Sequence, residues 1–112
     1  MVWKNLEQLT ELEELETASY AHPILILKHS TRCSISDVAK ARLDREDNLN
    51  GVDFIYLDLI KYRDISNALA EKFNVHHESP QVLLIYKGEC VYDESHIGIS
   101  MAEIKEQVSS LS

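Results

Sequence analysis

The sequence predicts an α/β fold, a mixed β-sheet covered by helices, in a single domain that spans residues 1–112. Apolar runs such as ILIL at residues 24–27 contain no polar interruption, which is typical of strands buried on both faces. The segments between these runs carry apolar residues at helical spacing. Two later runs are separated only by Lys87-Gly88-Glu89, which indicates a β-hairpin. A chain of 112 residues fits one domain and is large enough to bury its own core.

The first half of the chain predicts a helix, a strand and a second helix. Leucines that recur every third residue among glutamates and glutamines predict the first helix: Leu6, Leu9, Leu12 and Leu15. Pro23 suits the first position of the strand at residues 24–27, because proline has no backbone N–H to donate. The second helix is expected to end at about Asn50-Gly51. Its apolar residues have helical spacing: Ile35, Val38, Ala39 and Leu43.

The second half predicts a strand, a helix, the hairpin and a closing helix. The strand lies within VDFIYLDL, residues 52–59, and the hairpin within SPQVLLIYKGECVYD, residues 79–93. Between them, four apolar residues mark the helix: Ile65, Ala68, Leu69 and Phe73. The closing helix is amphipathic, with its apolar residues at Met101, Ile104, Val108 and Leu111.

The resulting element order is α-β-α-β-α-β-β-α, and it predicts the topology of the sheet. Strands separated by helices are expected to be parallel, and the terminal hairpin adds an antiparallel edge. The sheet is expected to hold about four strands. This is the element order of the thioredoxin-like three-layer fold, preceded by an N-terminal helix extension.

Charge and composition exclude several classes of function. The chain has 19 Asp and Glu against 11 Lys and Arg, so no basic surface is concentrated enough to neutralise a nucleic-acid backbone. No apolar run approaches the roughly 20 residues that span a bilayer. The start, MVWKNLEQLT, lacks the regions of a secretory signal. We therefore expect a cytoplasmic, monomeric protein with neither a nucleic-acid nor a membrane partner.

The chain contains two cysteines, Cys33 and Cys90. A structural disulfide is not expected, because the cytoplasm keeps thiols reduced. No group of Cys and His residues has zinc-ligand spacing, so neither a metal nor a bound cofactor is expected. Cys90 lies on the second strand of the hairpin and is interpreted as a core or edge-strand residue rather than a resolving cysteine.

Cys33 lies between the strand at residues 24–27 and the start of the next helix. A helix N-terminus has unpaired N–H groups and the positive end of the helix dipole, and both favour an anion such as a thiolate. Lys28, His29 and Arg32 add positive charge nearby, although strand alternation turns some of them away. This placement favours a reactive thiol over the alternative, a small residue at a buried strand end.

Ser36 occupies the position at which a Cys-x-x-Cys enzyme carries its resolving cysteine. A hydroxyl can donate a hydrogen bond to a thiolate, but it cannot form a disulfide. A Cys-x-x-Ser site can still attack a mixed disulfide and take the small thiol onto itself, after which an outside thiol must release it. The alternative is that Ser36 satisfies backbone groups of the first helical turn, and both roles can hold together.

A proline directly before an apolar strand is the second landmark. In HESPQVLLIY the Ser79-Pro80 bond is expected to be cis and to face Cys33, as in thioredoxin-like proteins. The backbone of Ser79 is then expected to pair with the bound thiol compound, as a strand added edge to edge.

Three stretches, LKHSTRCSIS, HHESPQVLLIYKG and ESHIGIS, together resemble the YtxJ-like monothiol bacilliredoxin family, and the resemblance runs through most of the chain. It implies a cytosolic thioredoxin-like protein of bacteria that use bacillithiol, a low-molecular-weight thiol, as co-substrate. It also implies a thiol-disulfide oxidoreductase that removes bacillithiol from S-bacillithiolated client proteins. The motif cysteine is Cys33, the motif serine is Ser36, and Pro80 matches the proline opposite the site.

The sequence departs from the family pattern, Cys-Pro-Ile-Ser, at Ser34. Proline favours the first helical turn and lacks an N–H that can bond a thiolate, so Ser34 is expected to change the surroundings of the sulfur without removing the nucleophile. Ser34 beside Ser36 also keeps a second function open. This alternative is a non-catalytic thioredoxin-fold module that binds protein partners.

The remaining binding candidates follow from the resemblance. The region around His96 and Gly98 is expected to help hold the small thiol, as in related thioredoxin-like enzymes. The alternative is a strand-to-helix turn with Ser100 as N-cap. Bacillithiol carries a malate unit, so a positive contact is expected, and Arg32 is the nearest candidate.

Overall fold

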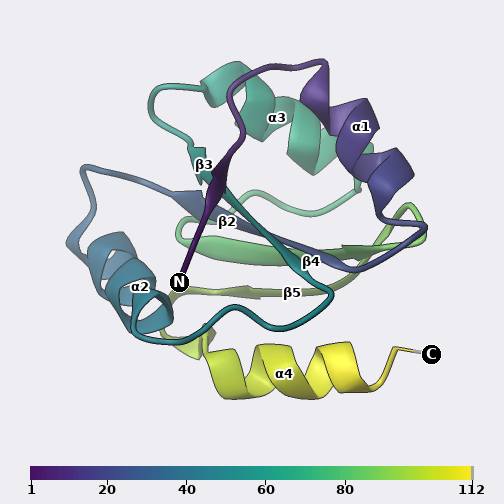
Figure 1. Ribbon diagram of the computed structural model, residues 1–112. Coiled ribbons are helices and arrows are strands. Elements are labelled where there is room, and N and C mark those ends of the chain that lie inside the picture. Colours follow the sequence, from purple (N-terminus) through teal and green to yellow (C-terminus); the bar gives the residue numbers. More distant parts are fainter. Residues whose placement is uncertain (112) are drawn as a thin grey trace.

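The computed structural model describes residues 1–111 and has the predicted α/β architecture, with helices on both faces of one sheet (Figure 1). The elements in chain order are β1 (Lys4–Asn5), α1 (Glu11–Ala18), β2 (Ile24–His29), α2 (Ser34–Asp44), β3 (Asp53–Asp58), α3 (Arg63–Lys72), β4 (Gln81–Tyr86), β5 (Glu89–Ser95), a 3₁₀ turn η1 (His96–Gly98) and α4 (Met101–Ser109). The strand order across the sheet is β1-β3-β2-β4-β5.

The sheet is mixed, as predicted, but one connection differs from the expectation. β2 and β3, joined through α2, are parallel, whereas β4 is antiparallel to β2 although α3 precedes it. The segment that follows α3 brings the chain back to the end of the sheet at which β2 finishes, because Gln81 pairs with Lys28. β4 therefore runs in the opposite direction. The hairpin of β4 and β5 is antiparallel, as predicted.

The N-terminal segment corrects two expectations. The sheet has five strands rather than about four, because β1 pairs in parallel with β3 through Lys4 and Ile55. The first helix begins at Glu11, not near Leu6. Leu6 instead continues the pairing, with its N–H donating to the Tyr56 carbonyl at 2.9 Å, and its side chain is buried. Burial of Leu6 and pairing with β3 thus hold the segment extended, which a leucine spacing alone does not reveal.

The sheet separates two apolar cores. One lies under α1 and α3, and the other under α2 and α4 (Figure 1). Alternate residues of β2 supply them: Ile24 and Ile26 enter the first core, and Leu25 and Leu27 enter the second. All four are fully buried, as expected for a central strand covered on both faces. In the described part of the chain, no helix has both the length and the apolar character needed to cross a bilayer.

Two further features complete the fold, the end of α2 and the turn of the hairpin. α2 ends at Asp44, earlier than the expected end near Asn50-Gly51, because the residues that follow are mostly polar and present no continuous apolar face. The hairpin turns at Lys87 and Gly88, which have φ of 53° and 79°. Positive φ at both central residues is typical of a type I′ hairpin turn, and glycine adopts it without steric cost.

Candidate functional site

Three loop segments at one end of the sheet form the candidate site. Lys28, next to the last residue of β2, pairs with Gln81 at the start of β4, and Gln81 pairs with Ser95 at the end of β5. Three segments therefore meet at this end of the sheet: the one after β2, the one before β4 and the one after β5 (Figure 1). They are the segments that carry Cys33, Pro80 and His96, so the structure brings these predicted site residues to the same end of the sheet.

Cys33 lies at the start of α2, as predicted, and is the N-cap of that helix. Its backbone is extended, with φ −122° and ψ 120°, and its carbonyl accepts the first helical hydrogen bond from Asp37 N–H at 3.0 Å. Its own N–H donates to the Ser30 carbonyl at 3.2 Å. The side chain is partly exposed, and the thiol is free. A reactant can therefore reach a sulfur that stands at the positive end of the helix dipole.

Ser36, three residues after this cysteine, is fully buried and is held by a hydrogen-bond network. Its Oγ accepts from Ser30 N–H at 3.0 Å and lies 2.7 Å from His29 Nδ1. Among residues 1–111 its hydroxyl has these two partners and no hydrogen bond to Cys33. Ser36, in the first turn of α2, therefore does satisfy a backbone group, but that group is the N–H of Ser30, which precedes the helix.

His29 is a residue whose position the sequence analysis did not assign. It is the last residue of β2, it is buried, and its Nε2 lies 3.4 Å from Asp37 Oδ1. Burial lowers the pKa of His29, while Asp37 opposes this effect. The signal was present in the alternation of β2, because His29 shares its face with Leu25 and Leu27, which pack under α2.

Lys28 points to the other side of the sheet. Its Nζ lies 2.6 Å from His77 Nδ1 and donates to Gln81 Oε1 at 3.2 Å. Burial lowers the pKa of Lys28 to about 8, and the charge of Glu78 acts in the opposite direction. Gln81 in turn donates to the His76 carbonyl at 3.0 Å. Lys28 therefore ties the loop before β4 to β2 rather than adding charge beside the sulfur.

The Ser79-Pro80 bond is cis, as predicted. The Pro80 carbonyl accepts from His96 N–H at 3.0 Å, which joins the start of β4 to η1. Ser79 Oγ is buried and has no hydrogen-bond partner within residues 1–111. His96 has a positive φ of 56°, and its Nε2 lies 3.5 Å from Glu78 Oε2. The two predicted binding segments are thus in direct contact.

The other predicted binding residues occupy different surroundings. Arg32 and Ser34 are exposed on either side of Cys33 in the chain. Gly98 faces the Glu94 side chain, because a Cβ placed on this glycine would lie 2.6 Å from Glu94 Cδ. Ser100 is the N-cap of α4, with its Oγ accepting from Glu103 N–H at 3.2 Å.

An apolar groove of about 230 Å³ lies between α2 and η1, next to the site. Its lining includes three exposed apolar residues: Ile35, Val38 and Ile97. The sequence pattern grouped Ile35 and Val38 with Ala39 and Leu43 by their helical spacing, but only Ala39 and Leu43 are buried. Helical spacing marks a stripe of apolar residues and does not show which part of the stripe the sheet covers.

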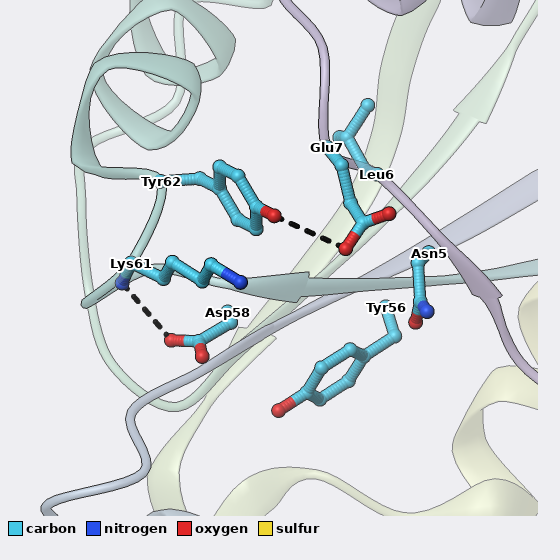
Figure 2. Close-up of a pocket in the computed structure, with 7 residues that line it drawn as sticks. All are labelled: Asn5, Leu6, Glu7, Tyr56, Asp58, Lys61 and Tyr62. Atoms are coloured by element: carbon cyan, nitrogen blue, oxygen red, sulfur yellow. Dashed lines mark hydrogen bonds between the residues drawn. The ribbon is translucent and has the colours of Figure 1, made fainter.

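A second, smaller pocket of about 120 Å³ lies at the end of β3 (Figure 2). Two pairs in its lining are hydrogen-bonded: Tyr62 Oη donates to Glu7 Oε2 at 3.1 Å, and Asp58 Oδ1 accepts from Lys61 N–H at 3.2 Å. Tyr56, also in its lining, has its ring 5.7 Å from the ring of His29. None of the predicted site residues lines this pocket, so it is a neighbour of the site rather than the site itself.

Cys90 lies on β5, an edge strand, as predicted. Its thiol is free and packs against the core under α1 and α3. Burial raises the pKa of Cys90 to about 11, so this thiol is neutral near pH 7 and is a poor nucleophile. No group of three or more His, Cys, Asp or Glu side chains in the described part of the chain is arranged to hold a metal.

Comparison with known proteins gives one matching family and a set of similar folds. The family model described as "Monothiol bacilliredoxin BrxC" matches residues 4–104. A solved structure that is described, with reservation, as an oxidoreductase with a thioredoxin fold has 29% sequence identity and a TM-score of 0.82, covering 95% of this chain and 93% of its own.

Thioredoxins from distant organisms share the fold at low sequence identity. The thioredoxin of Malassezia sympodialis is 8% identical, with a TM-score of 0.73 and coverage of 96% of this chain and 89% of its own. A thioredoxin mutant from Halobacterium salinarum is 19% identical, with a TM-score of 0.68 and coverage of 95% and 87%. At such identities the likeness shows the fold alone, and it confirms the thioredoxin-like architecture.

Proposed function

The chain belongs to the monothiol bacilliredoxin family, a family of thioredoxin-fold thiol redox proteins, and from that premise we propose that it removes bacillithiol from S-bacillithiolated proteins. The observation that carries this proposal is the contrast between its two thiols. Cys33 is partly exposed at the N-terminus of α2, whereas Cys90 is held neutral by burial. Ser36 stands where a resolving cysteine would be needed for a dithiol reaction.

The proposed reaction consists of two thiol–disulfide exchanges. The Cys33 thiolate attacks the bacillithiol sulfur of the mixed disulfide, and the client thiolate leaves and takes a proton. A new disulfide then joins Cys33 to bacillithiol. A second low-molecular-weight thiolate attacks this adduct, forms a disulfide with bacillithiol and restores the Cys33 thiolate. Each step breaks one S–S bond and forms another, so no further oxidant or reductant takes part.

The neighbours of Cys33 have distinct proposed roles. The backbone of Ser79, before the cis bond to Pro80, would pair with the extended part of the bound thiol compound. Arg32 is exposed and would contact the malate carboxylates of bacillithiol. The contact between Pro80 and His96 places η1 against the same loop, which supports a role of this turn in holding the small thiol.

The proposal is tested by measuring release of the client thiol. A purified client carrying bacillithiol is mixed with an excess of the protein, and the free client thiol is followed in time. We expect release with the wild type and with Cys90→Ser, the matched control, and none above background with Cys33→Ser. Equal rates for Cys33→Ser and the wild type would refute the assignment of Cys33 as the nucleophile.

A non-catalytic interaction module is the second candidate function, and the apolar groove of Ile35, Val38 and Ile97 favours it. An exposed apolar patch of this kind can bind a protein partner without turnover. The same assay separates the two candidates. A module would bind the client, as seen by co-elution in size-exclusion chromatography, but would release no thiol in the wild type.

A further inference from the structure

A buried hydrogen-bonded chain connects the last residue of β2 to the first turn of α2. Ser36 Oγ accepts from Ser30 N–H at 3.0 Å and lies 2.7 Å from His29 Nδ1, and His29 Nε2 lies 3.4 Å from Asp37 Oδ1. Ser36 is 0% exposed, and the His29 side chain is 6% exposed. Water therefore cannot readily replace a bond lost among Ser30, Ser36 and His29, so these three buried groups constrain one another, whereas Asp37 is exposed to solvent.

The contacts favour one direction for the bond between His29 and Ser36 when His29 is neutral. The Asp37 carboxylate can only accept, which favours the ring proton on Nε2. Nδ1 is then an acceptor, and the Ser36 hydroxyl must donate to it. The single hydroxyl proton of Ser36 is then donated to the imidazole, and the other hydrogen bond at Oγ is one that it accepts from Ser30 N–H. In this state the hydroxyl has no proton to offer a thiolate.

Protonation of His29 reverses the bond to Ser36. Both ring nitrogens of an imidazolium donate, so Nδ1–H donates to Ser36 Oγ and the hydroxyl proton becomes free to turn. Cys33 is the N-cap of α2 and Ser36 is the third helical residue, a position from which a side chain can reach back to the N-cap. A Cys33 thiolate would be an anionic acceptor for that proton.

We infer that His29 is a positioning residue that acts through Ser36 and sets whether the Cys33 thiolate receives a hydrogen bond. The inference deepens the proposed function and rests on Cys33 as its nucleophile. When His29 is neutral, the hydroxyl points to the imidazole and the thiolate lacks this bond. When His29 is protonated, the hydroxyl donates to the thiolate, and a larger fraction of Cys33 is ionised at the same acidic pH.

The charges that face His29 come from α2 and β3. Asp37 and Lys40 lie on α2, Asp58 lies on β3, and the ring of Tyr56 on β3 is also adjacent. Burial is the largest effect on the pKa of His29 and lowers it from 6.5, with Lys40 acting in the same sense and the two carboxylates opposing. The exchange of hydrogen bonds is therefore expected on the acidic side of pH 6.5.

The pH profile of Cys33 alkylation by iodoacetamide tests this inference. In a Cys90→Ala background Cys33 is the one cysteine left in the chain, so the measured alkylation rate is that of Cys33 alone. In the wild-type site, the logarithm of the rate plotted against pH should bend twice, once with the ionisation of Cys33 and once below pH 6.5 with His29. On the acidic side of the lower bend the rate should exceed that of Ser36→Ala by roughly 3- to 10-fold, the effect of one hydrogen bond.

Three variants decide the outcome. His29→Asn retains a group that can bond Ser36 but does not titrate, and Ser36→Ala removes the hydroxyl, so both should lose the lower bend. His22→Asn is the matched control, since His22 pairs with Asp53 away from the site, and it should keep both bends. A single bend in the wild-type site overturns the inference. So does a lower bend that survives in Ser36→Ala, because the imidazolium charge alone would then act on the sulfur.

A surface variant keeps the test decisive if His29→Asn or Ser36→Ala does not fold. Asp37 is 63% exposed and raises the pKa of His29, so Asp37→Asn should fold and should move the lower bend to lower pH. An unmoved bend contradicts the inference. Alkylation uses neither bacillithiol nor a client, so these results are independent of whether the protein passes the client-release assay.

Discussion

Ser34 is the single residue at which this sequence departs from the family motif that it otherwise resembles. It is the first residue of α2, and Cys33 before it has φ −122° and ψ 120°. Proline at the first helical position forces its predecessor into this extended region, so the backbone already suits Ser34→Pro. We expect this variant to raise the free energy of unfolding by about 0.4–1 kcal/mol through the unfolded chain, measured by urea denaturation.

Ser34→Ala is the control for this substitution, because it removes the hydroxyl without restricting the backbone. A loss of stability in Ser34→Pro greater than in Ser34→Ala would show that Ser34 N–H makes an interaction that the folded protein needs.

The buried amine of Lys28 is expected to make the free energy of unfolding depend on pH. Its pKa is lowered from 10.5 to about 8, chiefly by burial, so between these values the unfolded state binds more protons than the folded state. Stability therefore rises with pH through this window, and the full cost of the buried charge is present below about pH 8. We expect the wild type to gain stability relative to Lys28→Met between pH 7 and pH 10 in urea unfolding.

Lys105→Met on the exposed face of α4 is the control, and its difference from the wild type should stay nearly constant over the same range. A constant difference for Lys28→Met as well would mean that the Lys28 amine is not taken out of water by folding.

The sequence could place the residues of the proposed site but not the buried groups next to them. Cys33 and Pro80 were predicted because each stands at the end of an apolar run, where the chain changes element. His29 and Lys28 were treated together as nearby charge, yet they point to opposite faces of the sheet. Side chains alternate along β2, so Lys28 and His29 must point to opposite faces of the sheet. The sequence does not show which of these faces α2 covers, because that depends on tertiary packing.

At the scale of elements, the cap of α4 fixes the chain direction after η1. Ser100 Oγ accepts from Glu103 N–H at 3.2 Å and satisfies one of the unpaired N–H groups of the first turn. Ser100→Ala is expected to lower the free energy of unfolding by about 1 kcal/mol. Ser109→Ala at the exposed end of the same helix should change it far less, and equal effects of the two substitutions would argue against the cap.

Element boundaries followed from the sequence where a run of apolar residues ends abruptly. β2 and β4 lie at the predicted runs, whereas β1 was missed and α2 was extended too far. β1 consists of two exposed residues, and its pairing with β3 is a long-range contact with no local signal. The end of α2 depends on which of its residues pack against the sheet. The segment after Asp44 is mostly polar and has few side chains that could be buried there.

At the scale of the whole molecule, the sheet separates the site from half of the core. Leu69 is fully buried under α1 and α3, on the face opposite to α2. Leu69→Ala is expected to cost about 2–5 kcal/mol, seen as a lower urea midpoint. The alkylation rate of Cys33 in the folded variant should stay unchanged. Val91→Ala, at an exposed position, serves as the control, and a large change in Cys33 reactivity would show that the two cores are coupled.

The overall topology was predictable because a few strong patterns agree. The central strand is apolar throughout, a helix-spaced segment follows it, and a hairpin closes the sheet, which leaves few arrangements. The direction of β4 was not predictable from the rule that helices connect parallel strands, since the loop before β4 keeps the chain at the site end of the sheet. That same loop carries the cis bond to Pro80 into the site.

The most direct test of the central claim is to locate bacillithiol after one turnover. The protein is incubated with a bacillithiolated client and no other thiol, quenched in acid, and examined by intact mass and peptide mapping. We expect one bacillithiol per chain, in disulfide linkage on the peptide that contains Cys33, with the client thiol free. Bacillithiol that remains on the client, or that is found on Cys90, would contradict the proposal that Cys33 carries out the exchange.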